Sequence, residues 1–211
     1  MIIGVLKEPS YETRVSLLAE SITALIKKGN KLIVESGAGD QSFNNDQEYE
    51  KAGAEIKSRA EVLKQADILL SIHPLQDKDL VQVNSKILLG VYQPLSNGEN
   101  VIKSIERKIT TFSLDMLPRT TRAQTMDVLS SQANIAGYKA VLLAANSYGR
   151  YFPMFMTAAG SIAPAKMLIL GAGVAGLQAI ATARRLGAVV EVFDTRPAVK
   201  EEVMSLGAKF V

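Results

Sequence analysis

The sequence of 211 residues predicts an α/β protein built from two doubly wound parallel sheets covered by helices. Two observations lead to this class. Short apolar segments alternate with segments of helical spacing along the first hundred residues, and a glycine-rich turn lies between an apolar run and a helical segment near residue 171. With 47% hydrophobic residues, the chain can bury a substantial core.

The first hundred residues contain the segments that predict the first sheet. Residues 17–28 show the helical spacing, because Leu18, Ile22 and Leu25 share one face and Gly29 is placed to end the helix. By the same reasoning, strands are expected at 2–5, 31–35, 55–57, 68–72, 87–91 and 110–112, and further helices at 46–52, 59–65 and 101–105. This order predicts an N-terminal α/β domain over residues 1–123 with a flavodoxin-like fold.

The remaining residues predict a connecting helix and a second sheet. A long segment without proline, 124–145, is expected to be helical and to begin a connection that occupies residues 124–165. Beyond it, strands are expected at 167–170, 189–193 and from Lys209, with helices at 174–186 and 198–206. Elements in this order form the first half of a six-stranded Rossmann domain, so residues 166–211 are expected to be incomplete. A longer chain or a partner chain would supply the other half.

The glycine-rich turn follows the strand expected at 167–170. It reads Gly171, Ala172, Gly173, Val174, Ala175 and Gly176. A diphosphate needs backbone N–H groups aimed at it, and a turn from strand to helix offers them only where no side chain blocks the approach. Gly171 permits the tight turn, Gly173 permits the approach of the diphosphate, and Gly176 permits close packing of the helix on the strand. The pattern therefore predicts a dinucleotide-binding site.

An acidic residue, Asp194, stands at the end of the next expected strand. Its carboxylate would accept hydrogen bonds from ribose hydroxyls and repel a 2′-phosphate, which favours NAD(H) over NADP(H). Arg196 favours NADP(H) instead, since a nearby guanidinium can hold a 2′-phosphate. The alternative is that Arg196 is only a solvated cation of the loop. Asp194, Thr195 and Arg196 are therefore candidate cofactor-binding residues.

Composition excludes several kinds of site. The absence of cysteine excludes disulfides, zinc thiolate sites and thiol nucleophiles, and a single histidine, His73, excludes a multi-histidine metal cluster. No metal site is therefore expected. His73 itself is expected to be a loop residue at a strand end, without a partner.

Charge and hydropathy indicate a cytosolic protein. The net charge of +3 is small, and basic and acidic residues are interspersed along the chain, so nucleic acid binding is not indicated. Glu8 and Glu12 interrupt any pattern of a secretory signal. The uncharged stretch 167–183 is short for a membrane span and contains three glycines, so a buried strand, turn and helix explain it better.

Three stretches resemble the alpha subunits of proton-translocating NAD(P) transhydrogenase, a family similar to alanine dehydrogenase. The first is the opening, residues 4–9 with 12–15, which both enzymes share. The second is 118–132, continued by Gly137 and Tyr138, which resembles the nicotinamide loop of the transhydrogenases. The third is the glycine-rich turn together with residues 194–198 and 207–210. The resemblance spans the whole chain, and its middle stretch is the most specific.

The resemblance implies roles for four residues of the middle stretch. Asp127 and Ser130 would hold the carboxamide of the nicotinamide. Arg119 would lie against the bound NAD(H), and Gln124 would reach towards the second nucleotide. A fixed cation, an amide and two acceptors suit such a ligand, and positions 127 and 130 share a face if the segment is helical. The alternative is that Arg119, Arg122 and Asp127 cap and solvate the start of a helix.

The same resemblance implies an enzyme that transfers hydride between NAD(H) bound here and NADP(H) bound on a partner component. This transfer needs two nicotinamide rings in contact and shielded from water, so no acid or base from the protein is expected. The implied partners are the NADP-binding component and the membrane proton-channel component, and the implied assembly is a homodimer. The implied location is cytoplasmic, peripheral on the inner face of the membrane through these partners.

Two other functions stay open from the sequence. The first is an alanine dehydrogenase-like amino acid oxidoreductase, in which Arg14 would match the substrate arginine. That family's lysine is missing at residues 71–73, and its catalytic histidine is missing at 91–93. The second is a non-catalytic nucleotide-sensing module that keeps the fold without turnover.

Overall fold

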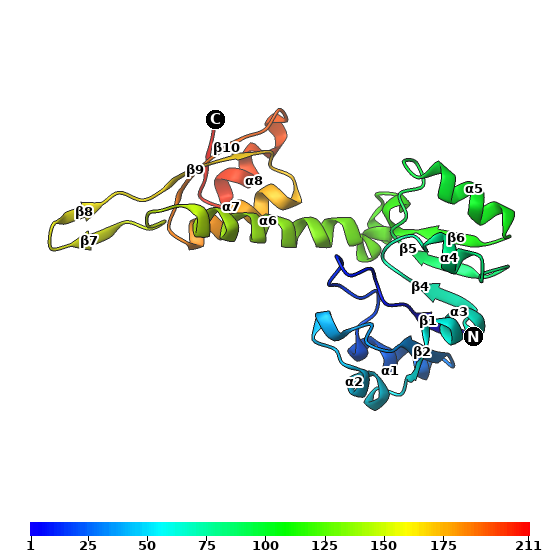
Figure 1. Ribbon diagram of the computed structural model, residues 1–211. Helices are drawn as coiled ribbons and strands as arrows, with labels where there is room; N and C mark the ends of the chain where they lie inside the picture. Colours follow the sequence, from blue (N-terminus) through cyan, green and yellow to red (C-terminus); the bar gives the residue numbers. More distant parts are fainter. The chain divides into compact units, whose positions relative to one another are not determined.

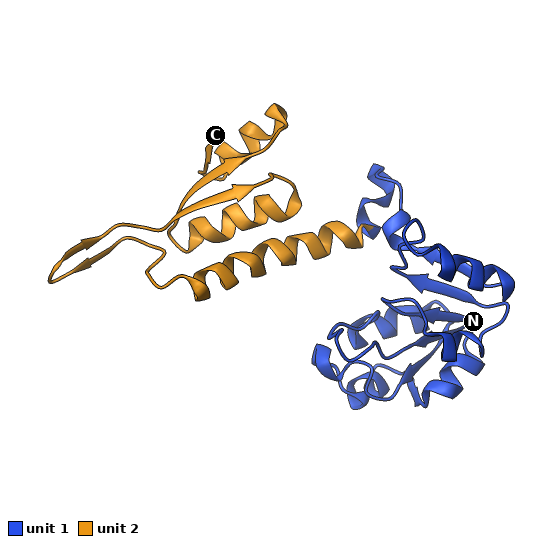
Figure 2. Ribbon diagram, turned by 45° about the horizontal axis from the view of Figure 1, so that its top comes forward, with its two compact units in different colours: residues 1–126 blue, residues 127–211 orange.

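The structure is a computed structural model that describes residues 1–211. It divides into two compact units, Met1–Met126 and Asp127–Val211, which Figure 2 shows in different colours. Each unit contains a parallel sheet with helices packed on it, so the expected α/β class is confirmed. None of the helices combines the length and the apolar character needed to cross a lipid bilayer.

Unit 1 contains a six-stranded sheet in the order β3-β2-β1-β4-β5-β6, in which all neighbours are parallel (Figure 1). The strands are β1 (Ile2–Val5), β2 (Lys31–Glu35), β3 (Glu55–Lys57), β4 (Ile68–Leu70), β5 (Ile87–Gly90) and β6 (Thr110–Ser113). This is the 3-2-1-4-5-6 strand order of the Rossmann fold, whereas flavodoxin has the order 2-1-3-4-5. The expected doubly wound parallel sheet is confirmed, but the expected flavodoxin-like strand order is wrong. After β3 the chain crosses back so that β4 lies beside β1, and the strands that follow are added on the other side of the sheet. The positions of strand-like segments in the sequence do not reveal on which side a new strand is added.

Five α-helices and three short 3₁₀ helices complete unit 1. They are α1 (Ala19–Lys27), α2 (Asp46–Lys51), α3 (Arg59–Gln65), α4 (Asp77–Leu80), α5 (Gly98–Glu106), η1 (Asp40–Ser42), η2 (Leu114–Met116) and η3 (Thr121–Met126). A capping box starts α3, in which Ser58 and Glu61 exchange hydrogen bonds with each other's backbone N–H. Helix α3 packs tightly on β1, because a Cβ on Gly4 would lie 2.7 Å from the side chains of Val62 and Ala66.

The sheet of unit 1 is buried on both faces. Along β2, Leu32 and Val34 belong to one apolar cluster and Ile33 belongs to another. The first cluster contains Ile22 of α1, and the second contains Val62 of α3. Successive residues of a strand point to opposite faces, so α1 and α3 cover opposite sides of the sheet. The continuous apolar runs of β1, β2 and β4 follow from this double burial.

Unit 2 contains a long helix, a small antiparallel hairpin and a three-stranded parallel sheet in the order β11-β10-β9. Its elements are α6 (Val128–Ser147), β7 (Phe155–Thr157), β8 (Gly160–Ile162), β9 (Lys166–Leu170), α7 (Val174–Arg185), β10 (Val189–Phe193), η4 (Pro197–Val199), α8 (Lys200–Ser205) and β11 (Lys209–Phe210). The expected strands and helices around the glycine-rich turn are all present. The hairpin β7–β8 was not expected.

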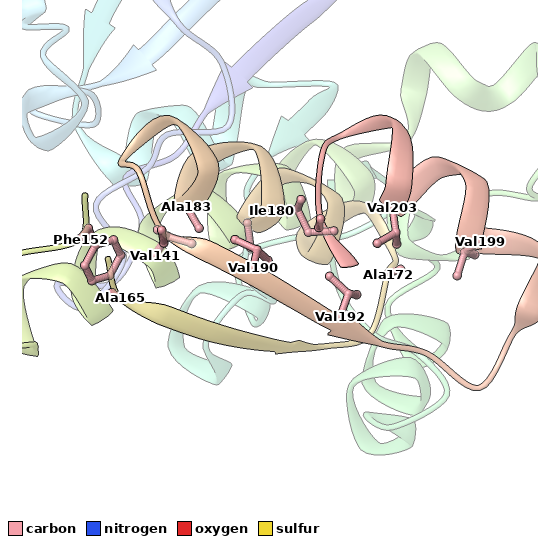
Figure 3. Close-up of a cluster of buried hydrophobic side chains, with 13 residues drawn as sticks. Val141, Phe152, Ala165, Ala172, Ile180, Ala183, Val190, Val192, Val199 and Val203 are labelled. Atoms are coloured by element: carbon pink, nitrogen blue, oxygen red, sulfur yellow. The ribbon is translucent and has the colours of Figure 1, made fainter. Parts of the chain in front are cut away.

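One apolar cluster fills unit 2 (Figure 3). Ile180 of α7, Val190 and Val192 of β10 and Val203 of α8 are all buried in it. Helix α6 packs closely on α7, because a Cβ on Gly137 would lie 2.0 Å from the carbonyl oxygen of Ala175. The glycine within α6 is therefore a packing requirement, and it brings the start of α7 against α6.

Candidate functional site

The glycine-rich turn lies between β9 and α7, as the sequence predicted. Gly171 follows β9 with a φ of +96°, a conformation that side chains rarely adopt. A Cβ on Gly176 would lie 1.9 Å from the carbonyl oxygen of Gly171, so only glycine permits this closeness between helix and turn. Two of the three glycines are thus required by the fold of the turn itself.

Gly173 differs from the other two, because a Cβ built there would meet no atom within 4 Å. It is the N-cap of α7, and no side chain caps this helix start. The first N–H groups of a helix have no partner within the helix and favour a negative charge. An open space in front of an uncapped helix start is the arrangement that a diphosphate requires, so these residues fit the phosphates of a dinucleotide.

Asp194 lies directly after β10 and is tied to the same turn. Its Oδ2 accepts a hydrogen bond of 2.7 Å from the backbone N–H of Ala172. Both carboxylate oxygens also accept from the guanidinium of Arg196, at 3.0 Å from Nε and 2.9 Å from Nη2. Arg196 first, and then the Ala172 N–H, hold the pKa of Asp194 well below its usual range. The carboxylate is therefore ionised at neutral pH and fixed in place, while Thr195 is exposed beside it.

The four residues expected to contact the nicotinamide fall on both sides of the division between the units. Arg119 and Gln124 belong to unit 1 and are exposed, as is Arg122. Asp127 and Ser130 belong to unit 2, and the structure brings these two together. Asp127 is the N-cap of α6: Oδ1 accepts from the Ser130 backbone N–H at 2.9 Å, and Oδ2 accepts from Ser130 Oγ at 2.7 Å.

Helix capping is therefore one role of Asp127, as the alternative sequence interpretation held. The helix begins at Val128 rather than at residue 124, because residues 121–126 form the 3₁₀ helix η3. The same hydrogen bonds fix the directions of both side chains. A preset carboxylate and hydroxyl at a helix start form a suitable pair of contacts for a carboxamide.

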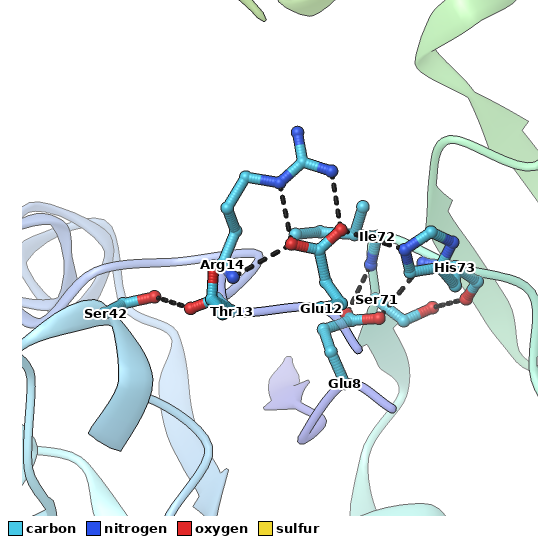
Figure 4. Close-up of polar contacts among 8 residues, drawn as sticks. All are labelled: Glu8, Glu12, Thr13, Arg14, Ser42, Ser71, Ile72 and His73. Carbon is cyan, nitrogen blue, oxygen red and sulfur yellow. Dashed lines mark hydrogen bonds and ion pairs between the residues drawn. The ribbon is translucent and has the colours of Figure 1, made fainter. Parts of the chain in front are cut away.

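A second polar cluster lies in unit 1 and was missed by the sequence interpretation (Figure 4). The expectation that His73 lacks a partner is wrong, since its Nε2 lies 2.9 Å from Oε2 of Glu12. The ring of Tyr11 also lies edge-on to the His73 ring, with 5.4 Å between centroids. His73 follows β4 and Glu12 follows β1, so the contact depends on these strands being neighbours.

Glu12 is the centre of this cluster. The guanidinium of Arg14 donates to both of its oxygens, at 2.8 and 2.6 Å. Arg14 first among several contacts lowers the pKa of Glu12 to about 2. Next to it, the buried Glu8 accepts hydrogen bonds from the backbone N–H groups of Ile72 and His73, while burial raises its pKa. These contacts hold the long segment after β1 against the end of β4.

A third polar group joins β1, β2, α3 and α4. Arg59 donates to Glu35 at 2.7 Å, to Asp79 at 2.9 Å and to the backbone carbonyl of Lys7 at 3.0 Å. The Lys7 backbone N–H in turn donates to Glu35 at 2.8 Å. Every charged group of this set has a partner within unit 1, so we regard it as a structural network.

The strand order of unit 1 and the glycine-rich turn of unit 2 define an α/β protein of the dinucleotide-binding type. The chain belongs to the alanine dehydrogenase/PNT family. The model of that family's N-terminal domain matches residues 4–136, and the model of its C-terminal domain matches residues 140–211.

Three relatives show where the chain stands within this family. It is 42% identical to NAD(P) transhydrogenase subunit alpha of Haemophilus influenzae, over 100% of this chain and 41% of the relative. It is 48% identical to the solved transhydrogenase of Sinorhizobium meliloti, with a TM-score of 0.97 over 100% of this chain and 64% of that one. It is 26% identical to alanine dehydrogenase of Staphylococcus saprophyticus, over 98% of this chain and 56% of the relative. The chain spans about half the length of the curated relatives that it matches.

Proposed function

We propose that this chain is the NAD(H)-binding component of a proton-translocating transhydrogenase, which transfers hydride between NAD(H) and NADP(H) held by a partner component. The observation that supports this most is a contrast in identity over nearly the whole chain. Identity is 42% to a transhydrogenase alpha subunit and 26% to an alanine dehydrogenase. The missing lysine and histidine of alanine dehydrogenase agree with this contrast.

Unit 2 supplies the proposed contacts to the cofactor. The N–H groups at the start of α7 would bind the diphosphate in the open space beside Gly173. The fixed carboxylate of Asp194 would accept hydrogen bonds from the ribose hydroxyls, and Thr195 and Arg196 lie next to it. Arg196 pairs with Asp194 and neutralises part of the carboxylate's negative charge. Repulsion of a 2′-phosphate would therefore depend on the Asp194 carboxylate staying at its position beside the turn.

The nicotinamide of the bound cofactor would supply the hydride, so the chain's own residues need only orient the ring and exclude water. Asp127 and Ser130 would hold its carboxamide, Arg119 would lie against the cofactor, and Gln124 would reach towards the second nucleotide. Because no group has to gain or lose a proton, exposed cations and amides suffice. This explains why a site without an acid or base is compatible with hydride transfer.

The proposal includes partners. An NADP-binding component would bring the second nicotinamide, and a membrane component would couple the transfer to proton movement. We further propose a homodimer, located in the cytoplasm and peripheral on the inner face of the membrane through these components.

Hydride transfer from NADH to an NADP analogue, measured with an added NADP-binding component, tests the proposal. Arg119→Ala and Asp127→Asn should each lower the rate at least tenfold, whereas Arg122→Ala, an exposed arginine of the same segment, serves as the matched control. Transfer that is unchanged in the first two variants would contradict their roles. NADH binding without any transfer would favour the sensing module, and NAD-dependent oxidation of alanine would favour the dehydrogenase.

A further inference from the structure

A cavity of about 280 Å³ lies in unit 1 beneath helix α5. Leu88 of β5, the buried Ile109 beside β6 and Leu80 of α4 are among the residues that line it. Val101 and Ile105 of α5 line it from the helix side. No residue of the glycine-rich turn or of the nicotinamide loop takes part, so this cavity is separate from the proposed cofactor site.

Helix α5 does not fill the space below it. Its apolar residues gather on one side, yet none of its residues is buried. Val101 is 37% exposed and Ile105 is 68% exposed, although both line the cavity. A helix with a one-sided apolar face normally buries that face against a core. Here Val101 and Ile105 border a space that the other lining side chains leave unfilled, and this space is open to solvent on the side of α5.

Three polar side chains of the lining, those of Tyr92, Asn97 and Ser104, are hydrogen-bonded within the protein. Tyr92 Oη and Ser71 Oγ lie 3.0 Å apart, and Asn97 Nδ2 donates to the Tyr92 carbonyl at 3.0 Å. Ser104 Oγ donates to the carbonyl of Asn100 at 2.8 Å. The lining contains no charged side chain, so an ionised ligand would find no opposite charge.

Tyr92 forms the polar end of this cavity, and Gly90 permits its position. A Cβ on Gly90 would lie 2.7 Å from the Tyr92 ring and 1.9 Å from the carbonyl oxygen of Ser71. Glycine therefore lets the aromatic ring lie against the end of β5. Burial also raises the pKa of the Tyr92 phenol, so this wall of the cavity is neutral.

We propose that the cavity binds a small uncharged molecule that is mostly apolar and contains one or two rings. Its volume is near the lower end of ligand sites, which begin at about 300 Å³. The apolar side chains that make up most of the exposed lining favour an apolar ligand, and the polar groups among them would set its orientation. This inference does not depend on the proposed cofactor site, since its residues all belong to residues 74–113.

Indole, a neutral two-ring molecule, is a suitable probe for the full chain, and indole-3-acetate is its charged counterpart. Titration followed by ¹H–¹³C methyl NMR should give saturable shifts at Leu88 and Ile109. The carboxylate should bind at least about tenfold more weakly, because its charge has no partner in the cavity. Shifts that do not saturate, that arise outside residues 74–113, or that are equal for both molecules would overturn the proposal.

Two variants of α5 make the test specific. Ser104→Phe places a ring in the cavity from a half-buried lining position and should abolish the indole shifts. Ile102→Ala changes an exposed residue of the same helix outside the lining and should leave them intact. Where Ser104→Phe does not fold, Val101→Phe fills the same space from the neighbouring turn. Indole binding that persists in a folded variant with the filled cavity would show that the site lies elsewhere.

Discussion

The segments that follow the first strand of each sheet differ in length and in side chains. In unit 1, residues 6–18 separate β1 from α1, and this long segment contains Glu8, Glu12 and Arg14. In unit 2, residues 171–173 alone separate β9 from α7, and they have almost no side-chain atoms. The first segment folds against the end of its sheet and forms ion pairs there. The second leaves the helix start open.

The two sheets are otherwise alike around their first two strands. Val34 of β2 pairs with the last residue of β1, and Phe193 of β10 pairs with the last residue of β9. The next residue is acidic in both units: Glu35 in unit 1 and Asp194 in unit 2. These two carboxylates therefore occupy equivalent positions in the two sheets.

The equivalent carboxylates also accept equivalent hydrogen bonds. Glu35 accepts from the Lys7 backbone N–H at 2.8 Å, and Asp194 accepts from the Ala172 backbone N–H at 2.7 Å. Lys7 and Ala172 are each the second residue after their strand. Each acid thus ties the second strand of its sheet to the segment that leaves the first strand.

The arginine partners distinguish the two units. Arg59 joins Glu35 to Asp79 in a half-buried network, whereas Arg196 is exposed and pairs with the side chain of Asp194. The acid–arginine pair of unit 1 therefore has a structural role. The corresponding pair of unit 2 lies at the edge of an open turn, where a ligand could reach it. The two roles differ because the segment after the first strand is long and charged in unit 1, and short and almost without side chains in unit 2.

The largest expected effect concerns the open turn itself. Gly176→Ala should lower the free energy of unfolding of unit 2 by about 3 kcal/mol, because its Cβ would overlap the carbonyl oxygen of Gly171. Gly173→Ala, the matched change in open space, should alter that stability by less than about 0.5 kcal/mol. It should nevertheless weaken NADH binding at least tenfold by blocking the diphosphate. Denaturant unfolding and NADH titration check both, and an undiminished NADH affinity in Gly173→Ala would contradict the proposed site.

The next prediction separates the equivalent acids. Glu35→Gln should destabilise unit 1 by about 2 kcal/mol, because Arg59 loses a charged partner, and should leave NADH affinity unchanged. Asp194→Asn should weaken NADH binding about tenfold through the ribose contacts, with a smaller effect on stability because its partner Arg196 is more exposed than Arg59. Unfolding curves and NADH titrations of both variants provide the measurement. If both variants change only stability, the two acids have the same structural role.

The elements that the sequence predicted best are those whose signals are local. The strand Val189–Phe193 was expected with the bounds that the structure has, because apolar residues end at a turn on each side. The glycine-rich turn was expected for the same reason. Helix α4, Asp77–Leu80, is a single turn and is too short to show periodicity. The hairpin β7–β8 was missed because its residues are exposed and do not alternate in polarity.

The contacts that the sequence did not predict are those between distant segments. Glu12 and His73 meet only because β4 returns to lie beside β1, and no local pattern specifies this neighbour. The sequence offered helix capping as one role of Asp127. Its hydrogen bond from Ser130 could not be predicted, because the sequence did not show that α6 begins at Val128. The residues of the proposed nicotinamide contacts come from resemblance, and their roles stay predictions.

The polar cluster of unit 1 should make its stability depend on pH. The pKa of Glu12 is about 2 in the folded chain, below its ordinary value of 4.5. Its ionised form is therefore favoured by folding, so the contribution is complete above about pH 5 and is lost as the pH falls towards 2. Glu12→Gln should lower the free energy of unfolding by about 1.5 kcal/mol at pH 7, after allowance for the exposure of Arg14, and by almost nothing near pH 2.

Unfolding measured from pH 2 to pH 7 in the wild type and in Glu12→Gln tests this dependence. Glu50→Gln is the matched control, because Glu50 is an exposed carboxylate of the same unit on α2 and its replacement should change stability by less than about 0.5 kcal/mol. A difference between wild type and Glu12→Gln that is constant over this range would mean that Glu12 stabilises the loop through packing and not through its charge.

The smallest expected effect compares two helix caps. Ser58 caps α3 in unit 1 and Asp127 caps α6 in unit 2. Replacing either by Ala should cost about 1 kcal/mol of stability, because one backbone N–H at the helix start loses its acceptor. Only Asp127→Ala should also reduce hydride transfer, since we propose that this carboxylate holds the carboxamide. Transfer rates measured below the unfolding transition of both variants separate the two roles, and equal rates in Ser58→Ala and Asp127→Ala would leave Asp127 with capping alone.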